Sequence, residues 1–308
     1  MYDLAILGGG PAGVAAGVYA SRKRLKTIFI TKDWGGQSVV STGIENWIGT
    51  IKISGLDLAE NLKKHLEAYA PGIVDIKEGE LTEKIEKTAA GFKITAGTGS
   101  YQAKTLLVTT GSSRRKLSAK GADALEHRGI TYCASCDGPL FAGKEVVVVG
   151  GGNAGFETAA QLLAYCPSVT MIHRSEEFKA DPVTVDKVLS NPKMKVVKNA
   201  EITEVRGDKF VTGIVYLDKK TNQTRELPAQ GIFVEIGSVP NTAFLSGLVN
   251  LNQYGQIVVD AKTQRASLAG IWAAGDATDG LYHQNNIAAG DAVKALEDIY
   301  LYLHADKK

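Results

Sequence analysis

The chain has 308 residues, 44% of them hydrophobic and 22% charged, and a formal net charge of +2 at pH 7. This length suits two domains, and the composition is typical of a soluble globular protein. The near-neutral charge argues against a nucleic-acid partner, and no apolar run reaches the roughly 18 residues of a membrane-spanning helix.

The first residues predict a strand, a glycine loop and a helix rather than a signal peptide. An apolar run over 4–7 leads into Gly8-Gly9-Gly10-Pro11-Ala12-Gly13, and an Ala- and Gly-rich helical segment follows. In this context a Gly-x-Gly-x-x-Gly motif binds a dinucleotide, because glycines let the backbone approach a pyrophosphate and the helix N-terminus offers unpaired N–H groups. The acidic residue expected after the next strand, 27–31, is missing, so the motif is incomplete.

The region after this motif predicts one helix and several short strands. Polar, Gly-rich loops at 34–37 and 45–49 precede a helix over 56–69. Short alternating stretches between 74 and 103 predict a small antiparallel meander. A buried strand over 105–110 ends in Thr109-Thr110-Gly111, and residues 112–115 are the expected crossing into a second domain.

Two of the three cysteines form Cys133-Ala134-Ser135-Cys136, directly before Asp137. A Cys-x-x-Cys in a chain with few other thiols is redox-active or metal-binding. A structural zinc site needs four ligands, usually in two pairs, and here only Cys166 and scattered histidines remain. We therefore expect a redox pair and no metal. With no export signal and so few cysteines, we expect a cytoplasmic protein.

A second glycine motif follows the cysteine pair. A Val-rich strand over 145–149 leads into Gly150-Gly151-Gly152-Asn153-Ala154-Gly155, and a helix is predicted over 156–165. The next strand, 169–172, ends in the charged segment 173–179. Basic residues at this position, in place of an acid, favour a 2′-phosphate and hence NADP(H), although a solvated charged turn is the alternative.

The rest of the chain repeats the earlier pattern. Strands predicted between 196 and 236 follow the order of the first half, which indicates an internal duplication. A buried strand over 270–275 ends at Asp276. A final helix over 285–303 has its packing face on Ala288, Ala292, Ala295, Leu296 and Ile299.

Taken together, the order and spacing of these motifs resemble the low-molecular-weight thioredoxin reductase family over essentially the whole chain. The resemblance implies an α/β fold with two Rossmann-like, three-layer nucleotide-binding domains, the second inserted in the first. An FAD domain would comprise 1–114 and 244–308, and an NAD(P)H domain with the dithiol would comprise 115–243. The family is typically homodimeric.

The resemblance also implies roles for individual residues. Those expected to bind FAD are Gly8, Gly10, Pro11, Ala12, Gly13, Gly36, Gln37, Asn46, Thr110, Gly111, Gly275, Asp276, His283 and Gln284. Those expected to bind NAD(P)H are Gly150, Gly152, Asn153, Ala154, Gly155, His173, Arg174 and Lys179. Cys136 would face the flavin, Cys133 would attack the partner's disulfide, and Asp137 would exchange protons with the dithiol.

The sequence departs from that family at a few positions. Ser175 stands where a second arginine is usual, His283 where arginine is frequent, and Ile48 where proline follows the tryptophan. Two stretches, 178–181 and 231–234, look more like the flavoprotein component of alkyl hydroperoxide reductase, which prefers NADH. The basic residues within 173–179 still lead us to expect NADPH, and these departures make NADH possible.

The resemblance implies an enzyme that passes electrons from NAD(P)H through FAD to the Cys133–Cys136 disulfide, and then to thioredoxin or a similar disulfide protein. One alternative is an NADH-dependent reductase component of a peroxiredoxin or glutaredoxin-like system. An alternative of another class is a flavin-bound redox sensor without turnover.

Overall fold

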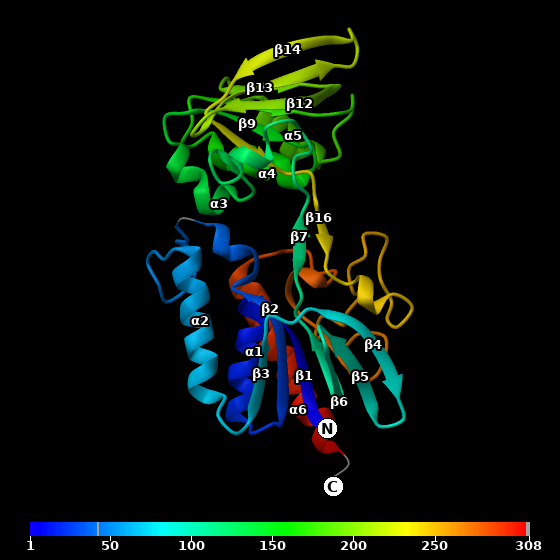
Figure 1. Ribbon diagram of the computed structural model, residues 1–308. Helices are drawn as coiled ribbons and strands as arrows, with labels where there is room; N and C mark the ends of the chain where they lie inside the picture. Colours follow the sequence, from blue (N-terminus) through cyan, green and yellow to red (C-terminus); the bar gives the residue numbers. More distant parts are fainter. Residues whose placement is uncertain (42, 306–308) are drawn as a thin grey trace. The chain divides into compact units, whose positions relative to one another are not determined.

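The computed structural model describes residues 1–41 and 43–305 (Figure 1). Contacts divide the chain into unit 1, Met1–Ser113 with Val239–Lys308, and unit 2, Arg114–Ser238. The second crossing falls after Ser238, whereas we expected it after residue 243. Strands β7 (Ser112–Arg114) and β16 (Ser238–Pro240) pair with each other and carry the two crossings.

Unit 1 is built on a seven-stranded sheet in the order β3-β2-β1-β6-β5-β4, with β17 also paired to β6. Strands β3, β2, β1, β6 and β17 are mutually parallel, and β4, β5 and the start of β6 form the antiparallel meander. The strands are β1 (Tyr2–Gly9), β2 (Thr27–Trp34), β3 (Val74–Glu78), β4 (Thr82–Thr88), β5 (Gly91–Ala96), β6 (Gly99–Val108) and β17 (Ile271–Ala273).

Strand β6 joins the two parts of this sheet. Its first half pairs with β5, and its second half lies between β1 and β17. The burial pattern changes at the same point, because residues 99–104 alternate whereas residues 105–108 are all buried. The predicted strand over 105–110 is therefore the buried end of a longer strand. Strand β3 (Val74–Glu78) lies within the range that we predicted as a meander, but it pairs in parallel with β2 at the edge of the sheet.

Two cores cover the two faces of the unit 1 sheet. Leu4 and Ile6 of β1 point into a core with the helices, while Ala5 and Leu7 point into a core with the meander and residues 245–277. The helical elements are α1 (Pro11–Arg22), α2 (Gly55–Tyr69), α6 (Asn285–His304) and the short 3₁₀ turns η1 (Gly36–Val40), η4 (Ala243–Leu245) and η5 (Gly275–Ala277). The buried face of α6 is the predicted one, Ala288, Ala292, Ala295, Leu296 and Ile299.

Unit 2 has a five-stranded parallel sheet in the order β11-β10-β9-β15-β8 and a separate antiparallel sheet β12-β13-β14. Val147 and Val149 of β9 face the antiparallel sheet, and Val146 and Val148 face the helices. The strands are β8 (Ile130–Thr131), β9 (Glu145–Val149), β10 (Ser168–Ile172), β11 (Met194–Val197), β12 (Ala200–Gly207), β13 (Val211–Asp218), β14 (Gln223–Pro228) and β15 (Gly231–Val234).

The helices of unit 2, like those of unit 1, pack on one face of the parallel sheet. The helical elements of this unit are α3 (Ala134–Asp137), α4 (Asn153–Leu162), α5 (Pro182–Leu189) and the 3₁₀ turns η2 (Asp123–Leu125) and η3 (Gly138–Phe141). The predicted helix over 156–165 begins earlier, at Asn153, because Gly152 already accepts its first backbone hydrogen bond. Both units are thus three-layer α/β folds, as predicted.

The parallel cores of the two units are duplicates in topology. Strands β3, β2, β1, β6 and β17 of unit 1 have the same order as β11, β10, β9, β15 and β8 of unit 2. In unit 1 the meander is continuous with the parallel sheet, whereas in unit 2 it forms the separate β12-β13-β14 sheet. The predicted internal duplication is therefore present, and the strand that precedes the dithiol, β8, takes the place of β17.

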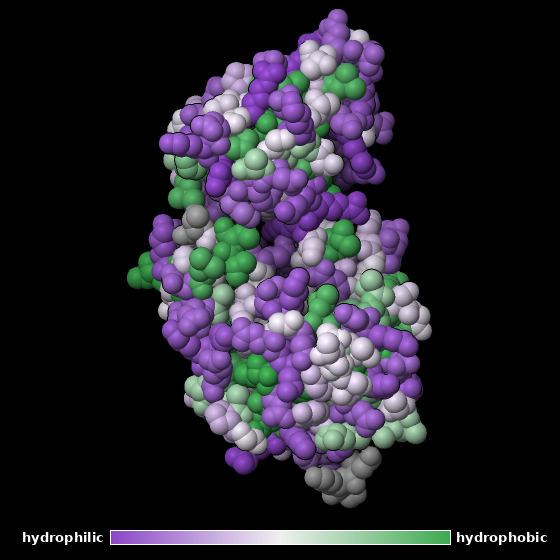
Figure 2. Space-filling model, in the orientation of Figure 1, coloured by the Kyte–Doolittle hydropathy of each residue, from purple (hydrophilic) through white to green (hydrophobic). Residues whose placement is uncertain are grey.

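The surface of each unit is mixed in polarity. Figure 2 shows many hydrophilic residues over β13 and β14, consistent with the exposed β14. Apolar residues stay exposed in unit 1 between η1 and α2, notably Ile48 at 82% and Ile51 at 93%. Within 1–41 and 43–305 no helix is long and apolar enough to cross a membrane.

Helix α2 offers a direct test of the unit 1 core. Leu66 is fully buried and packs on Gly17, where an added Cβ would lie 2.8 Å from the Leu66 side chain. We expect Leu66→Ala to lower the free energy of unfolding by about 2–5 kcal/mol, because it leaves a cavity. The control Leu56→Ala lies on the same helix at 70% exposure, and its effect should stay within about 0.5 kcal/mol. Equal losses in urea unfolding would contradict this packing.

Candidate functional sites in the two units

The first glycine loop lies where β1 passes into α1. Gly8 has φ +117°, and an added Cβ there would lie 2.4 Å from the Thr109 carbonyl oxygen. An added Cβ on Gly13 would lie 1.8 Å from the Gly8 carbonyl oxygen. These two positions therefore require glycine, because the helix starts directly on the strand end.

Gly10 has a different role in the same loop. Its Cβ position is open, and the nearest atom is the Cα of Gly36 at 3.9 Å. No side chain of the described residues caps α1, and Pro11 occupies its first turn. The loop therefore leaves space and unpaired N–H groups between two glycine segments, the arrangement that a pyrophosphate requires.

The second glycine loop, between β9 and α4, has the same geometry. Gly150 has φ +121°, and its Cβ would lie 2.2 Å from the Glu235 carbonyl oxygen. A Cβ on Gly155 would lie 2.1 Å from the Gly150 carbonyl oxygen. Nothing lies within 4 Å of a Cβ on Gly152, and no described side chain caps α4. Each unit therefore contains a glycine loop with this geometry, and both loops fit the dinucleotide that the sequence predicts, although the first lacks the acidic residue after its second strand.

Asp276 follows β17 at the same sheet edge as the first loop. An added Cβ on Gly275 would lie 3.1 Å from the Ala288 Cβ and 3.6 Å from the Ala12 Cβ. The turn is thus seated between α6 and the start of α1. His283 Nδ1 lies 3.3 Å from Asp276 Oδ1, so these two predicted residues are in contact.

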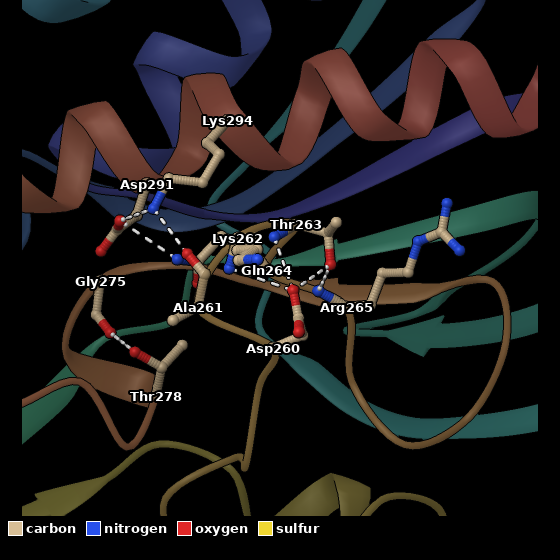
Figure 3. A network of polar contacts seen from close by, with 10 residues as sticks. All are labelled: Asp260, Ala261, Lys262, Thr263, Gln264, Arg265, Gly275, Thr278, Asp291 and Lys294. Carbon is tan, nitrogen blue, oxygen red and sulfur yellow. Dashed lines mark hydrogen bonds and ion pairs between the residues drawn. The ribbon is translucent and has the colours of Figure 1, made fainter.

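A polar network holds the strand that leads to this turn (Figure 3). Gln264 is 4% exposed, and its Nε2 donates to Asp291 Oδ1 of α6 at 3.1 Å. Lys294 Nζ bridges the same carboxylate at 3.1 Å and the Ala261 carbonyl oxygen at 2.9 Å. Because Ala273 N donates to the Gln264 carbonyl oxygen, this network ties α6 to the strand before Gly275.

The other predicted flavin residues form two contacts within unit 1. Asn46 Nδ2 donates to Gln284 Oε1 at 3.1 Å. Gln37 Nε2 donates to the Ser112 carbonyl oxygen at 2.5 Å and lies 3.1 Å from its hydroxyl. The loop that carries Gln37 and Asn46 is thus held both at the start of α6 and at the start of β7.

Sequence reasoning missed three asparagines that complete this frame. Asn241 contacts the Thr110–Gly111 segment through two hydrogen bonds. Thr110 Oγ1 donates to the Asn241 carbonyl oxygen at 2.8 Å, and Asn241 N donates to the Gly111 carbonyl oxygen at 3.0 Å. Asn286 Nδ2 donates to the Asn46 carbonyl oxygen at 2.7 Å, and Asn285 accepts from the Ser38 hydroxyl at 3.0 Å. Asn285 and Asn286 directly follow the predicted Gln284, whereas Asn241 has no predicted site residue beside it in the sequence.

Residues 173–181 wrap over the second glycine loop. Lys179 N donates to the Gly151 carbonyl oxygen at 2.9 Å, and Asp181 N donates to Asn153 Oδ1 at 2.8 Å. His173 is only 7% exposed, and its Nε2 contacts the Glu177 carbonyl oxygen at 2.8 Å. We predicted His173 as a phosphate contact, but its ring lies beneath Gly151, so the exposed cations here are Arg174 and Lys179.

The cysteine pair follows β8 at the carboxyl edge of the unit 2 sheet. Cys133 and Cys136 form a disulfide, and Cys133 caps the short helix α3, with Cys136 N donating to its Sγ at 3.2 Å. The Asp137 carboxylate accepts a short hydrogen bond from the Thr131 hydroxyl. Both cysteines are partly exposed, whereas Cys166 is buried and burial raises the pKa of its thiol. Within 1–41 and 43–305 no cluster of side chains could hold a metal ion.

Two glycines of the unit 2 loop allow nucleotide binding and folding to be tested by separate substitutions. Gly152 has φ −97°, which alanine adopts freely, and its Cβ would point into open space. We expect Gly152→Ala to keep the wild-type unfolding midpoint but to bind NAD(P)⁺ about tenfold more weakly. Gly155→Ala should instead lower the free energy of unfolding by about 1–3 kcal/mol through overpacking. Unchanged binding in the folded Gly152 variant, measured by calorimetry, would contradict this assignment.

Comparisons with solved structures match the whole chain. Thioredoxin reductase from Streptococcus pyogenes superimposes with a TM-score of 0.88 at 32% identity, covering 99% of each chain. Thioredoxin reductase from Giardia duodenalis gives 0.88 at 34% identity and covers 98% of each chain. The chain thus has the thioredoxin reductase fold in both units.

Curated relatives match in sequence over a comparable span. An alkyl hydroperoxide reductase component of Pseudomonas putida is 40% identical over 96% of this chain, and "NADH dehydrogenase" of Bacillus subtilis is 37% identical over 98%. The chain spans 56% and 58% of the length of these relatives, respectively. The family model for pyridine nucleotide-disulphide oxidoreductases matches residues 2–292, and the chain belongs to this family.

Proposed function

We propose that this protein is a flavoenzyme that passes electrons from NAD(P)H through FAD to the Cys133–Cys136 disulfide, and then to thioredoxin or a similar disulfide protein. The observation that carries the proposal is the position of the disulfide. It follows β8, two strands away from β9 and its glycine loop in the same parallel sheet. The two solved thioredoxin reductases, matched over nearly their full length, support the same assignment.

The two glycine loops would hold two different dinucleotides. Unit 1 would hold FAD through Gly8, Gly10 and Gly13. Asp276 would lie beside them, and Gln37 and Asn46 would contribute from the segment that precedes α2 in the chain. Unit 2 would hold the pyridine nucleotide through Gly150, Gly152 and Gly155. When bound, FAD supplies the two-electron chemistry that links a reduced pyridine nucleotide to a disulfide. The protein supplies the positions and the electrostatics.

The exchange itself needs only the dithiol and a partner. Once reduced, Cys133 as a thiolate attacks one sulfur of the partner's disulfide, and the other partner sulfur leaves as a thiolate and takes a proton. Cys136 as a thiolate then attacks the Cys133 sulfur, which reforms the internal disulfide and releases the second partner thiol. Each cycle moves two protons, and Asp137 is the nearby carboxyl group that we assign to this transfer. Asp137 directly follows Cys136, and its carboxylate accepts a hydrogen bond from the Thr131 hydroxyl.

The choice between NADPH and NADH rests on residues 173–181. Glu176 Oε2 pairs with Lys220 Nζ at 2.5 Å and accepts from Asn199 Nδ2 at 2.6 Å, so other partners already neutralise its charge. Arg174 and Lys179 remain exposed beside the loop and suit a 2′-phosphate. We therefore propose NADPH as the preferred nucleotide. NADH is the alternative that the name of the Bacillus subtilis relative favours.

The second candidate function is an NADH-dependent reductase component of a peroxiredoxin or glutaredoxin-like system. It is favoured by the sequence identity to the alkyl hydroperoxide reductase component of Pseudomonas putida. We also propose a homodimer and a cytoplasmic location. A flavin-bound redox sensor is distinguished from these enzymes by the absence of turnover with any disulfide protein.

Replacing one cysteine tests the proposed electron path. We expect Cys136→Ser to abolish turnover of a disulfide protein while NADPH still reduces the flavin, because only the disulfide step requires both sulfurs. The measurement is the flavin absorbance together with steady-state oxidation of NADPH. The control Cys166→Ala removes a buried thiol outside the site and should keep full turnover.

Two outcomes would contradict the path. Disulfide turnover that persists in Cys136→Ser would show that electrons bypass the pair. Purified protein that contains zinc and no flavin would support the metal interpretation of the cysteine pair.

Replacing two cations tests the nucleotide preference. We expect Arg174→Ala with Lys179→Ala to lower kcat/KM for NADPH by about tenfold or more and to leave NADH little changed, since only NADPH carries the 2′-phosphate. Lys187→Ala, an exposed cation on α5, is the matched control. A wild-type enzyme that prefers NADH and is insensitive to these changes would overturn the NADPH assignment.

A further inference from the structure

Four parallel strands bring four functional segments to one edge of the unit 2 sheet. The order across this edge is β10, β9, β15 and β8, and all four strands run in the same direction. Residues 173–181 follow β10, the glycine loop follows β9, and the disulfide follows β8. The residue that follows β15 is Glu235.

The pairing of β15 with β8 ends just before Glu235 on one strand and just before the disulfide on the other. Phe233 of β15 pairs with Thr131 of β8, and two residues further along each strand are Glu235 and Cys133. The Glu235 carbonyl oxygen also contacts the glycine loop, since a Cβ on Gly150 would lie 2.2 Å from it. Glu235 thus stands between the glycine loop and the dithiol strand.

A dinucleotide lies across the carboxyl ends of parallel strands, with its pyrophosphate on the glycine loop. This inference rests on the proposed function, in which residues 173–181 after β10 receive the adenosine half. The nicotinamide half must then extend to the opposite side of β9, across the end of β15. Glu235 is the ionisable residue at that strand end.

The surroundings of Glu235 bring the pKa of its carboxyl group close to neutral pH. It is partly exposed, and Thr158 of α4 donates its hydroxyl to Glu235 Oε1 at 2.8 Å. Burial raises the pKa of Glu235 to about 7, the repulsion of Glu157 on α4 adds to this, and Thr158 and Arg114 of β7 oppose it. Cys133 and Cys136 do not titrate while they form the disulfide. The carboxyl group therefore changes charge within the physiological pH range.

We propose that the Glu235 carboxylate receives the nicotinamide end of the pyridine nucleotide and favours its oxidised, cationic form over the reduced, neutral form. An ionised carboxylate attracts the positive ring of NAD(P)⁺ and gains nothing comparable from NAD(P)H. By linkage, binding of NAD(P)⁺ must hold Glu235 in its ionised state and release a proton near neutral pH.

The test is calorimetric binding to the oxidised holoenzyme between pH 6 and pH 8. The probes are NAD⁺ and NADP⁺, with ADP-ribose and 2′-phospho-ADP-ribose as fragments that lack only the nicotinamide. We expect the intact nucleotides to bind about tenfold more tightly at pH 8 than at pH 6, whereas the fragments show no such gain. The fragments cancel any effect of pH on binding of the 2′-phosphate and of the adenosine half, because they share both.

Variants assign the effect to the side chain. Glu235→Gln keeps an acceptor for Thr158 but should lose the pH dependence, the proton release and about tenfold of the NAD(P)⁺ affinity at pH 8. Glu235→Asp keeps the charge and should retain the proton release. Thr158→Val removes the hydrogen bond to the ionised form and should move the pH midpoint upward. The control Glu145→Gln, exposed at the amino end of β9, should behave as wild type.

The outcomes separate this inference from the proposed function. Equal pH dependence in wild type and Glu235→Gln, or equal dependence for nucleotides and fragments, overturns the role of Glu235 alone. If none of the four ligands binds the wild-type holoenzyme, the pyridine nucleotide site itself is overturned. If Glu235→Gln fails to fold, an unchanged midpoint in Thr158→Val overturns the inference.

Discussion

The structure depends on one close contact that occurs twice, between the last glycine of each loop and the carbonyl oxygen of the first. A Cβ on Gly13 or Gly155 would approach that oxygen to 1.8 or 2.1 Å, so only glycine lets the helix begin directly on the strand end. Open space at Gly10 and Gly152 lies beside the first turns of α1 and α4, which no described side chain caps. The same constraint therefore sets both the packing of each unit and the position of its proposed phosphate site.

Because the two parallel sheets share a strand order, their functional edges can be compared position by position. Beside the strand that leads into the glycine loop lies β6 in unit 1 and β15 in unit 2, followed in the chain by Thr109 and Glu235, respectively. Beyond it lies β17 or β8, followed by the turn with Asp276 or by the disulfide. The duplicated frame thus keeps the glycine loop constant, while the segments after the neighbouring strands carry the residues that would distinguish the proposed flavin site from the disulfide site.

Electrostatics distinguish the two ends of the proposed pyridine nucleotide site. At the β10 end, Glu176 is paired with Lys220, and Arg174 and Lys179 are exposed cations with Glu177 as an exposed acid between them. At the β15 end, Glu235 is an acid whose burial holds its pKa near neutrality. Positive charge at the phosphate end and a titratable acid at the ring end suit a ligand with an anionic adenosine half and a ring that is cationic in one redox state.

The sequence by itself determined the glycine loops, the Cys133–Cys136 pair, the helix over 56–69 and the buried face of the last helix, because each depends on local spacing. It also indicated the duplication and the three-layer α/β fold. Only the tertiary structure decided the dual pairing of β6, the burial of His173 beneath Gly151, and the asparagine contacts around Asn46 and Thr110. It also placed Glu235 between the glycine loop and the dithiol strand. These features depend on which strand ends meet at one sheet edge, and pairing between distant segments leaves no periodic signal in the sequence.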